Sequence, residues 1–175
     1  MKTKILITGP PRSGKSTLIV KLIEYFSKRQ IAVYGFLTPE VRKGNKRIGF
    51  DIVDIKTKVR KKLARKGKLN TKHYVGNYSV FIENLEKFIS NIEYIKFQKA
   101  DFIIIDEIGK MELFSKKFQE FVIKMFSSNN SIIATIGLII RHPIKDHLLN
   151  LPDVKLFTLD RQNYQTTYQK IISII

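Results

Sequence analysis

The sequence of 175 residues contains no cysteine, which excludes disulfides and thiolate metal sites. This absence fits a reducing compartment, so we expect a cytoplasmic protein. No run of apolar residues approaches the ~20 that are needed to span a bilayer, so we expect no membrane partner. The first apolar stretch ends at Gly9-Pro10-Pro11, too early for a signal peptide.

Acidic residues are also scarce: 15 Asp and Glu stand against 32 Lys and Arg, which leaves a net charge of +17. Such an excess attracts polyanions, namely nucleotides and, as an open alternative, nucleic acid. A compositional bias towards lysine would produce the same excess. The net charge alone therefore does not decide between nucleic-acid binding and compositional bias. With 43% hydrophobic residues and mixed charge, we predict one globular domain over residues 1–175.

A phosphate-binding pattern, G-x-x-x-x-G-K-[ST], stands out near the start of the chain. The apolar run at 5–7 predicts a strand before it, and the residues after it predict a helix to about Arg29. The glycines allow the backbone to curl around an anion, and the helix N-terminus faces the same point. The predicted nucleotide-binding residues are Gly9, Pro10, Pro11, Arg12, Ser13, Gly14, Lys15, Ser16 and Thr17.

Two side chains of this loop suit the chemistry of a nucleoside triphosphate. Lys15 can reach the β- and γ-phosphates, and the hydroxyl of Ser16 suits Mg²⁺. Arg12 occupies a position that is often glycine, so it either adds a cation near the phosphates or points to solvent. We therefore predict that the chain binds nucleoside triphosphates with Mg²⁺.

Further strands and helices alternate along the chain. This alternation predicts an α/β fold with a mainly parallel sheet, helices on both faces and a small antiparallel hairpin insertion. Ser79 is the expected N-cap of a helix with Phe81, Leu85, Phe88, Ile89, Ile92 and Ile95 on its apolar face. The other expected strands are 31–36, 47–55, 102–106, 131–136 and 154–159, with a turn at 38–40 and helices at 115–126 and 164–175.

The segment Lys56–Lys72 carries nine basic residues among seventeen. Its first part, 58–63, is expected to pair with strand 47–55 as a hairpin. Most of the segment nevertheless looks like an exposed, mobile loop, because Gly67 and Asn70 interrupt it. This segment is the candidate for weak, non-specific nucleic-acid binding.

The second half of the site is expected at Asp106-Glu107, which ends the buried strand 102–106. Ligands in open α/β sheets sit at the carboxyl ends of strands, so Asp106 is the candidate Mg²⁺ carboxylate. Glu107 is the candidate base that activates water, with Lys15 as its catalytic partner. An adjacent Asp-Glu pair also predicts that strand 131–136 lies between the strands of the loop and of Asp106. Thr135 would then lie near the γ-phosphate, although simple packing is the more common role.

Several segments resemble, in order, a small phosphate-loop nucleoside-triphosphatase family of archaea, bacteria and vertebrates. They are the loop at 9–17, then 35–42, 47–50, 75–80 and 106–113. The resemblance implies Mg²⁺-dependent hydrolysis of several nucleoside triphosphates to diphosphate and phosphate. It also implies that a run of residues lines the nucleotide site: Phe102, Ile103, Ile104, Ile105, Asp106, Glu107, Ile108 and Gly109.

The chain departs from the family pattern Asn-Arg-Asp, because Asn163 is followed by Tyr164. Tyr164 would have to replace the arginine by stacking, and Asn163 either contacts nucleotide or caps the last helix. Arg42 and Arg47 are candidates for neutralising transition-state charge or are surface residues. Arg141 follows a strand end and is a weaker nucleotide contact.

The sequence thus predicts a Mg²⁺-dependent hydrolase that acts on ATP, GTP, CTP and UTP with little base selectivity. No base-recognition motif is visible; Asn45-Lys46, for example, is not followed by the residues of a GTPase base-binding motif. Two alternatives stay open at this point. One is a nucleotide, nucleoside or RNA-end kinase on the same fold, and the other is a nucleotide-gated nucleic-acid-binding module.

Overall fold

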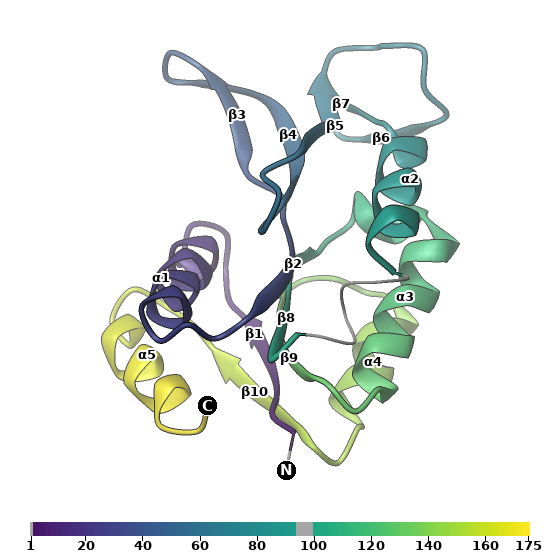
Figure 1. Cartoon of the computed structure of the whole chain (residues 1–175). Helices are drawn as coiled ribbons and strands as arrows, with labels where there is room; N and C mark the ends of the chain where they lie inside the picture. Colours follow the sequence, from purple (N-terminus) through teal and green to yellow (C-terminus); the bar gives the residue numbers. More distant parts are fainter. Residues whose placement is uncertain (1, 94–99) are drawn as a thin grey trace.

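The computed structural model describes residues 2–93 and 100–175 (Figure 1). Its strands form one ten-stranded sheet in the order β10-β1-β9-β8-β2-β4-β5-β7-β6, and β3 pairs with β4. The strands are β1 (Lys4–Thr8), β2 (Val33–Leu37), β3 (Glu40–Lys43), β4 (Lys46–Asp54), β5 (Arg60–Lys66), β6 (His73–Val75), β7 (Tyr78–Val80), β8 (Phe102–Ile108), β9 (Ser131–Ile136) and β10 (Val154–Thr158).

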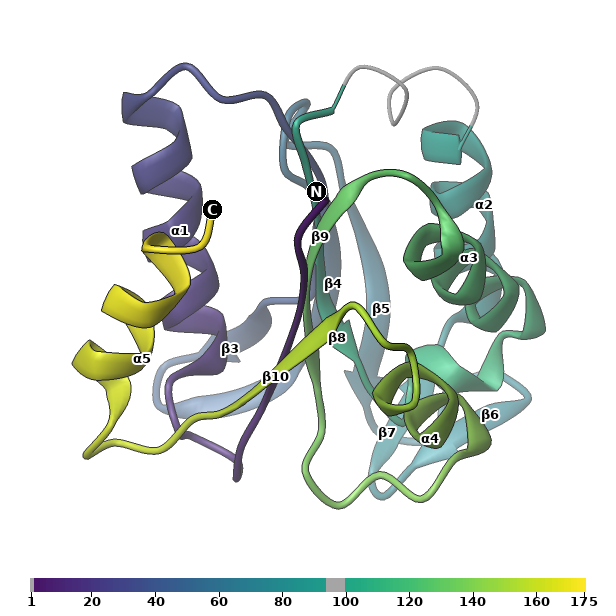
Figure 2. The same ribbon diagram turned by 90° about the horizontal axis from the view of Figure 1, so that it is seen from below.

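Helices cover both faces of the parallel half of this sheet (Figure 2). Helices α1 and α5 lie on one face, and α2, α3 and α4 lie on the other. The helices are α1 (Lys15–Lys28), α2 (Ile82–Glu93), α3 (Lys116–Ser127), α4 (Pro143–Leu149) and α5 (Tyr164–Ile172), and η2 (Glu112–Phe114) is a short 3-10 helix. Among the residues that the structure describes, no helix is both long and apolar enough to cross a membrane.

The central strands are buried because a hydrophobic core lies on each face of the sheet. Along β1 the side chains alternate: Ile5 and Ile7 pack under α1 and α5, and Leu6 packs under α2 and α3. All three are fully buried, as the two-residue period of a strand covered on both faces requires. The five strands from β10 to β2 pair in parallel, so their carboxyl ends meet at one edge. This edge holds the loop after β1 and the end of β8.

The predicted α/β fold with helices on both faces is confirmed. The strand Ser131–Ile136 lies between β1 and β8, as the adjacent Asp-Glu pair predicted. The predicted hairpin also forms, since β4 pairs antiparallel with β5. It belongs to a larger antiparallel lobe, β3 to β7, which Figure 1 shows at the top, away from both termini.

Two predictions for this lobe were wrong. Most of Lys56–Lys72 was expected to be a mobile loop, yet its middle forms β5, because Leu63 and Ala64 are buried and Arg65 pairs with Asp51 of β4. Ser79 was expected to cap a helix, yet it lies in β7. Its hydroxyl donates to the carbonyl of Gly67 (2.6 Å) and accepts from the N–H of Leu69 (2.9 Å).

Smaller differences concern the ends of elements. The expected turn at 38–40 is shorter, because β3 begins at Glu40. Helix α2 begins at Ile82, and Ile95 of its predicted apolar face lies outside the described residues. Helix α4 was not expected; Pro143 occupies its first turn and the ring nitrogen Nδ1 of His142 accepts from the N–H of Ile144 (3.2 Å).

Candidate active site

The phosphate loop connects β1 to α1 in a tight curl. A Cβ on Gly9 would lie 2.2 Å from the carbonyl oxygen of Leu159, so only glycine fits there. Gly14 has φ +98° at the N-cap of α1, a conformation that L side chains rarely adopt. The N–H of Ser13 donates to the carbonyl of Pro10 (3.2 Å), which closes the turn. The open N-terminus of α1 therefore faces the interior of the loop.

Lys15 and Ser16 begin α1 and reach different parts of the site. The ammonium of Lys15 donates to the carbonyls of Gly9 (3.0 Å) and Pro10 (3.2 Å), so it lies across the loop. The hydroxyl of Ser16 hydrogen-bonds the carboxylate of Asp106. The start of α1 and the end of β8 are therefore in direct contact.

Asp106 is 3% exposed and is held by hydroxyl groups from two elements. Thr135 of β9 donates to its Oδ1 (2.5 Å), and Ser16 provides the second hydrogen bond. Burial raises the pKa of Asp106, and Thr135, Ser16 and the charge of Lys15 oppose that rise. Thr135 thus contacts the candidate metal carboxylate directly.

Glu107 follows Asp106 at the end of β8, and the peptide bond between them is cis. Its N–H donates to the hydroxyl of Thr38 (3.2 Å), beside the end of β2. Burial raises the pKa of Glu107, the neighbouring carboxylate of Asp106 raises it further, and the charge of Lys15 lowers it. A carboxylate with a raised pKa is a better proton acceptor than an ordinary glutamate, which suits a general base.

The oxygen atoms at this edge fit a divalent cation. Asp106 and Ser16 supply a carboxylate and a hydroxyl, the hard ligands that Mg²⁺ prefers. Within residues 2–93 and 100–175, no three His, Asp or Glu side chains form a cage that could hold a metal on their own. An ion here would therefore complete its coordination with substrate phosphates and water.

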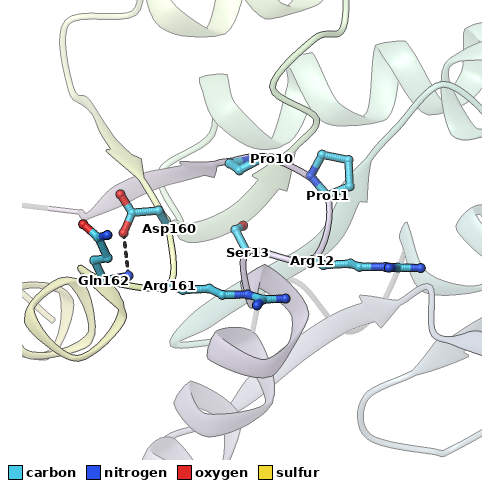
Figure 3. A pocket seen from close by; sticks show the side chains of 7 residues that line it. All are labelled: Pro10, Pro11, Arg12, Ser13, Asp160, Arg161 and Gln162. Carbon is cyan, nitrogen blue, oxygen red and sulfur yellow. Dashed lines mark hydrogen bonds between the residues drawn. The ribbon is translucent and has the colours of Figure 1, made fainter.

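A cavity of about 480 Å³ adjoins the phosphate loop (Figure 3). The turn before α5 forms its far wall; there, Oδ1 of Asp160 accepts from the N–H groups of Gln162 (2.8 Å) and Asn163 (2.7 Å). Ser13 is one of the residues that line the cavity, and its buried hydroxyl has no hydrogen-bond partner among the described residues. The lining residues are Pro10, Pro11, Arg12, Ser13, Asp160, Arg161 and Gln162.

The structure also shows where the C-terminal candidates lie. The ring of Tyr164 packs against Gly14. A Cβ added to Gly14 would lie only 3.2 Å from Cδ2 of Tyr164. Asn163 is the N-cap residue of α5, but its side chain makes no capping hydrogen bond to the helix backbone. Instead, its amide nitrogen donates to the carbonyl of Thr158 (2.9 Å), the last residue of β10. Tyr164 thus packs the start of α5 against the phosphate loop, whereas Asn163 holds the turn before α5 against the end of β10.

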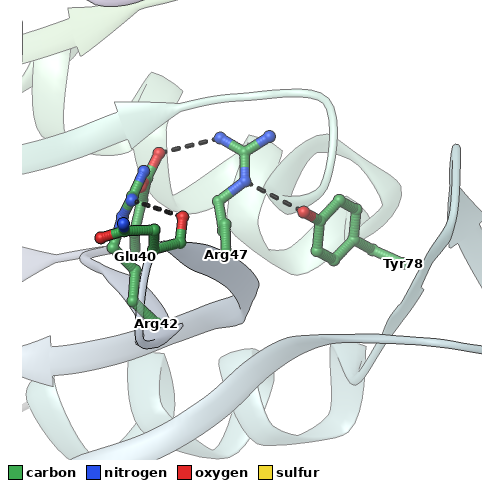
Figure 4. A network of polar contacts seen from close by, with 5 residues as sticks. Glu40, Arg42, Arg47 and Tyr78 are labelled. Atoms are coloured by element: carbon green, nitrogen blue, oxygen red, sulfur yellow. Dashed lines mark hydrogen bonds and ion pairs between the residues drawn. The ribbon is translucent and has the colours of Figure 1, made fainter.

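Arg42 and Arg47 lie in the antiparallel lobe, in a network with Glu40 and Tyr78 (Figure 4). Arg47 donates to Glu40 (2.8 Å) and to the hydroxyl of Tyr78 (3.0 Å), and Arg42 donates to Glu40 (3.0 Å). Both arginines are exposed and engaged with this network, which contains no residue of the phosphate loop. Arg141 is exposed after β9.

The remaining candidates from β8 are mostly core residues. Phe102 and Ile104 pack under α1, whereas Ile103, Ile105 and Ile108 pack under α2 and α3. These core residues position Asp106 and Glu107 at the carboxyl edge of the sheet and do not themselves form an exposed wall of the site. Gly109 ends the strand and lies against the carboxylate of Glu107.

Two polar residues of the site were not predicted from the sequence. The hydroxyl of Thr38, the residue after β2, accepts from the N–H of Glu107, and Glu112 is a carboxylate only 3% exposed near Glu107. Glu112 lies in the family-like segment 106–113, but its residue type and spacing alone indicate no role. Its burial depends on how η2 folds back onto β8, which no local pattern indicates.

Comparisons with known proteins cover nearly the whole chain. The NTPase family model matches residues 4–172. The chain is 39% identical over 173 residues to nucleoside-triphosphatase THEP1 of Thermotoga maritima, covering 98% of the chain and 95% of that protein. It is 38% identical over 174 residues to the THEP1 protein of Methanocaldococcus jannaschii, covering 98% and 96%.

Solved structures give the same result. The crystal structure of THEP1 from Aquifex aeolicus is similar with a TM-score of 0.83 and 36% identity, covering 98% of each chain. The solution structure of a human cancer-related nucleoside triphosphatase has a TM-score of 0.79 at 32% identity, covering 98% of this chain and 96% of that one. The predicted resemblance is thereby confirmed. Matched from β1 to the end of α5, the chain belongs to the NTPase family, the nucleoside-triphosphatases that include THEP1.

Proposed function

We propose that the chain hydrolyses nucleoside 5'-triphosphates to the diphosphate and phosphate in a Mg²⁺-dependent reaction. One observation carries the proposal: α1, β8 and β9 bring Lys15, Ser16, Asp106 and Thr135 together, with Glu107 next to them. A phosphate-binding loop, a metal carboxylate and a carboxylate base are the groups that water attack on a γ-phosphate requires. Membership of a nucleoside-triphosphatase family supports hydrolysis over the kinase alternative.

The loop and Lys15 bind the substrate and stabilise charge. The N–H groups at the start of α1 hold the phosphates, helped by the positive end of the helix dipole. The ammonium of Lys15, which lies across the loop, stabilises the negative charge that develops on the γ-phosphoryl oxygens. Preorganised charges of this kind are effective because they do not have to reorient during the reaction.

Asp106 and Ser16 would hold Mg²⁺. When bound, the ion neutralises phosphate charge and favours departure of the diphosphate. Thr135 and Ser16 fix the carboxylate of Asp106 through hydrogen bonds, so its oxygens keep one orientation.

Glu107 is the proposed base. It takes a proton from water as the water oxygen bonds to the γ-phosphorus, and the bond from the γ-phosphorus to the bridging oxygen breaks. The proton goes to the Glu107 carboxylate and the diphosphate leaves with the bridging oxygen. Thr38, which binds the N–H of Glu107, helps to hold the base in place.

We predict little selectivity among the bases. The cavity beside the phosphate loop presents proline rings, Arg161 and Gln162, and Oδ1 of Asp160 is engaged in the turn. The sequence carries no base-recognition motif, and the contacts assigned above go to phosphate or metal, so ATP, GTP, CTP and UTP should differ by only ~1–2 kcal/mol in transition-state binding. Measuring kcat/KM for the four nucleotides tests this. A preference above about a thousandfold for one base would contradict it.

Weak, non-specific nucleic-acid binding is also proposed, through Lys56–Lys72. Beside β5, a cavity of about 640 Å³ is lined by Lys66, Lys68 and the exposed ring of Tyr74, a combination of charge and stacking surface that suits a single strand. Each neutralised phosphate adds roughly one unit to the slope of log affinity against log salt. We expect binding to disappear at moderate salt.

The test uses two variants with equal changes of charge. The first replaces five exposed lysines of the segment with glutamine: Lys58, Lys62, Lys66, Lys68 and Lys72. The control replaces five exposed lysines elsewhere: Lys2, Lys28, Lys116, Lys155 and Lys170. Titrating single-stranded RNA at several salt concentrations should show binding and a steep slope for the control, and neither for the first variant. Equal loss in both variants, or tight binding that resists salt, would contradict the proposal.

A further inference from the structure

The cavity of about 480 Å³ lies between the phosphate loop and the turn before α5 (Figure 3). Its volume falls within the range of roughly 300–1,000 Å³ that is usual for small-molecule sites. The loop contributes the rings of Pro10 and Pro11 to one wall, and Asp160, Arg161 and Gln162 form the other. The proposed reaction assigns the substrate phosphates to the loop but gives this cavity no occupant.

Hydrogen bonds within the turn hold its wall of the cavity in one conformation. Oδ1 of Asp160 accepts from the N–H groups of Gln162 (2.8 Å) and Asn163 (2.7 Å). In return, Oδ1 of Asn163 accepts from the N–H of Asp160 (3.0 Å), and the amide of Asn163 donates to the carbonyl of Thr158 (2.9 Å). Because this wall is already ordered, a ligand that binds against it loses little affinity to the ordering of the protein.

Ser13 brings a buried polar group to the cavity. The residue is 4% exposed, and its hydroxyl has no hydrogen-bond partner among the described residues. Such a hydroxyl is unfavourable in the free protein, because it has lost its hydrogen bonds to water and has gained none in return. A ligand in the cavity that hydrogen-bonds to Ser13 would supply the missing partner.

Arg161 brings a second polar group, which is exposed. Figure 3 shows its side chain extending from the turn towards the phosphate loop, whereas the side chain of Arg12 points away from the turn. Among the described residues, the guanidinium of Arg161 forms no ion pair with a carboxylate. A guanidinium is planar, with hydrogen-bond donors at its edge and a surface on each face that stacks on aromatic rings, so it suits a nucleobase.

We propose that this cavity binds the nucleoside half of the substrate, with the guanidinium of Arg161 stacked on the base and the hydroxyl of Ser13 hydrogen-bonded to the nucleoside. The inference rests on the proposed binding of the substrate phosphates by the loop, since the nucleoside is then attached directly beside the cavity. The face of a guanidinium stacks on any base, so these contacts add affinity without base selectivity.

The test compares two ligands that both carry a triphosphate but differ in the nucleoside. One is the β,γ-imido analogue of ATP and the other is inorganic triphosphate, each with Mg²⁺. Titration calorimetry measures both dissociation constants for wild type, Arg161→Ala and Ser13→Ala, and the thermal midpoint checks folding. The matched control is Arg29→Ala, which removes an exposed arginine at the end of α1.

Wild type and the control should bind the ATP analogue more tightly than inorganic triphosphate. Arg161→Ala should weaken binding of the ATP analogue about tenfold and leave that of inorganic triphosphate unchanged. Ser13→Ala should weaken binding of the ATP analogue about fivefold, again without effect on inorganic triphosphate. It should not lower the thermal midpoint, because the hydroxyl that it removes has no partner in the free protein.

Wild-type affinity for the ATP analogue in Arg161→Ala or in Ser13→Ala would overturn the proposal. So would an equal loss for both ligands, which would place the side chain on the phosphates, or equal binding of the two ligands by wild type. Lys15→Ala is measured in parallel to separate this result from the proposed function. If Lys15→Ala loses both ligands while Arg161→Ala and Ser13→Ala bind as wild type, only the nucleoside site fails. If Lys15→Ala binds both ligands as wild type, the loop does not hold the substrate phosphates.

Discussion

Replacing Glu107 with glutamine is expected to reduce hydrolysis of MgATP by at least ~10²-fold while nucleotide binding stays near wild type. Glutamine has nearly the same size and keeps a hydrogen-bonding side chain, but it cannot accept the proton of the attacking water. Because the pKa of Glu107 is raised by burial and by Asp106, the carboxylate is well suited to take that proton. Single-turnover phosphate release measures the chemical step, and titration with MgATP measures binding.

The matched control is Glu24→Gln, an exposed glutamate of α1. It should hydrolyse MgATP at the wild-type rate. If Glu107→Gln also hydrolyses at that rate, Glu107 is not the base. If instead it loses binding together with hydrolysis, the residue holds the nucleotide or the loop rather than the water.

Replacing Lys15 with alanine is expected to lower kcat/KM by at least ~10²-fold with the fold intact. The ammonium lies across the phosphate loop on the carbonyls of Gly9 and Pro10, where we expect it to stabilise the charge that develops in the transition state. Alanine suits a helix position, so α1 should still form. Steady-state kinetics and the thermal midpoint are the measurements.

The control for this variant is Lys28→Ala at the exposed end of α1. It removes the same charge from the same helix, far along the sequence from the loop. Comparable losses in both variants would point to a general effect of charge on nucleotide attraction. Turnover by Lys15→Ala close to wild type would refute the assignment of the substrate phosphates to this loop.

Local patterns made the central part of the fold predictable. The spacing of Gly9, Gly14 and Lys15 defines a strand, a loop and a helix within a few residues, because each position has its own steric or electrostatic requirement. The apolar run 102–105 can only be a strand that is buried on both faces. The order of β1, β9 and β8 followed from one pair of neighbouring carboxylates, Asp106 and Glu107.

The elements that were missed depend on distant contacts. In β5, five of seven residues are basic, and the strand becomes visible only when Leu63 and Ala64 find their core. Ser79 has the composition of a helix cap, but its hydroxyl binds Gly67 and Leu69 across the chain. Helix α4 is capped by a histidine ring, a residue that is not among the preferred caps.

The residues of the site also fall into two groups, those that local sequence patterns indicate and those that depend on distant contacts. The sequence suggested Lys15, Ser16 and Asp106 because the chemistry of each belongs to a known spacing or to a strand end. Thr38 and Glu112 gave no such signal, since Thr38 accepts from the N–H of Glu107 just beyond the end of β2 and Glu112 is buried by the fold of η2. Such residues are recognised only when the topology brings them together.

The central claim is that water, activated at this site, attacks the γ-phosphorus. The most direct test is hydrolysis of MgATP in water enriched in oxygen-18, with and without an added nucleoside or RNA 5' end as acceptor. The account predicts labelled oxygen in the released phosphate, none in ADP, and no effect of the acceptor. Label in ADP, or transfer of the γ-phosphoryl group to the acceptor faster than phosphate is released, would contradict it.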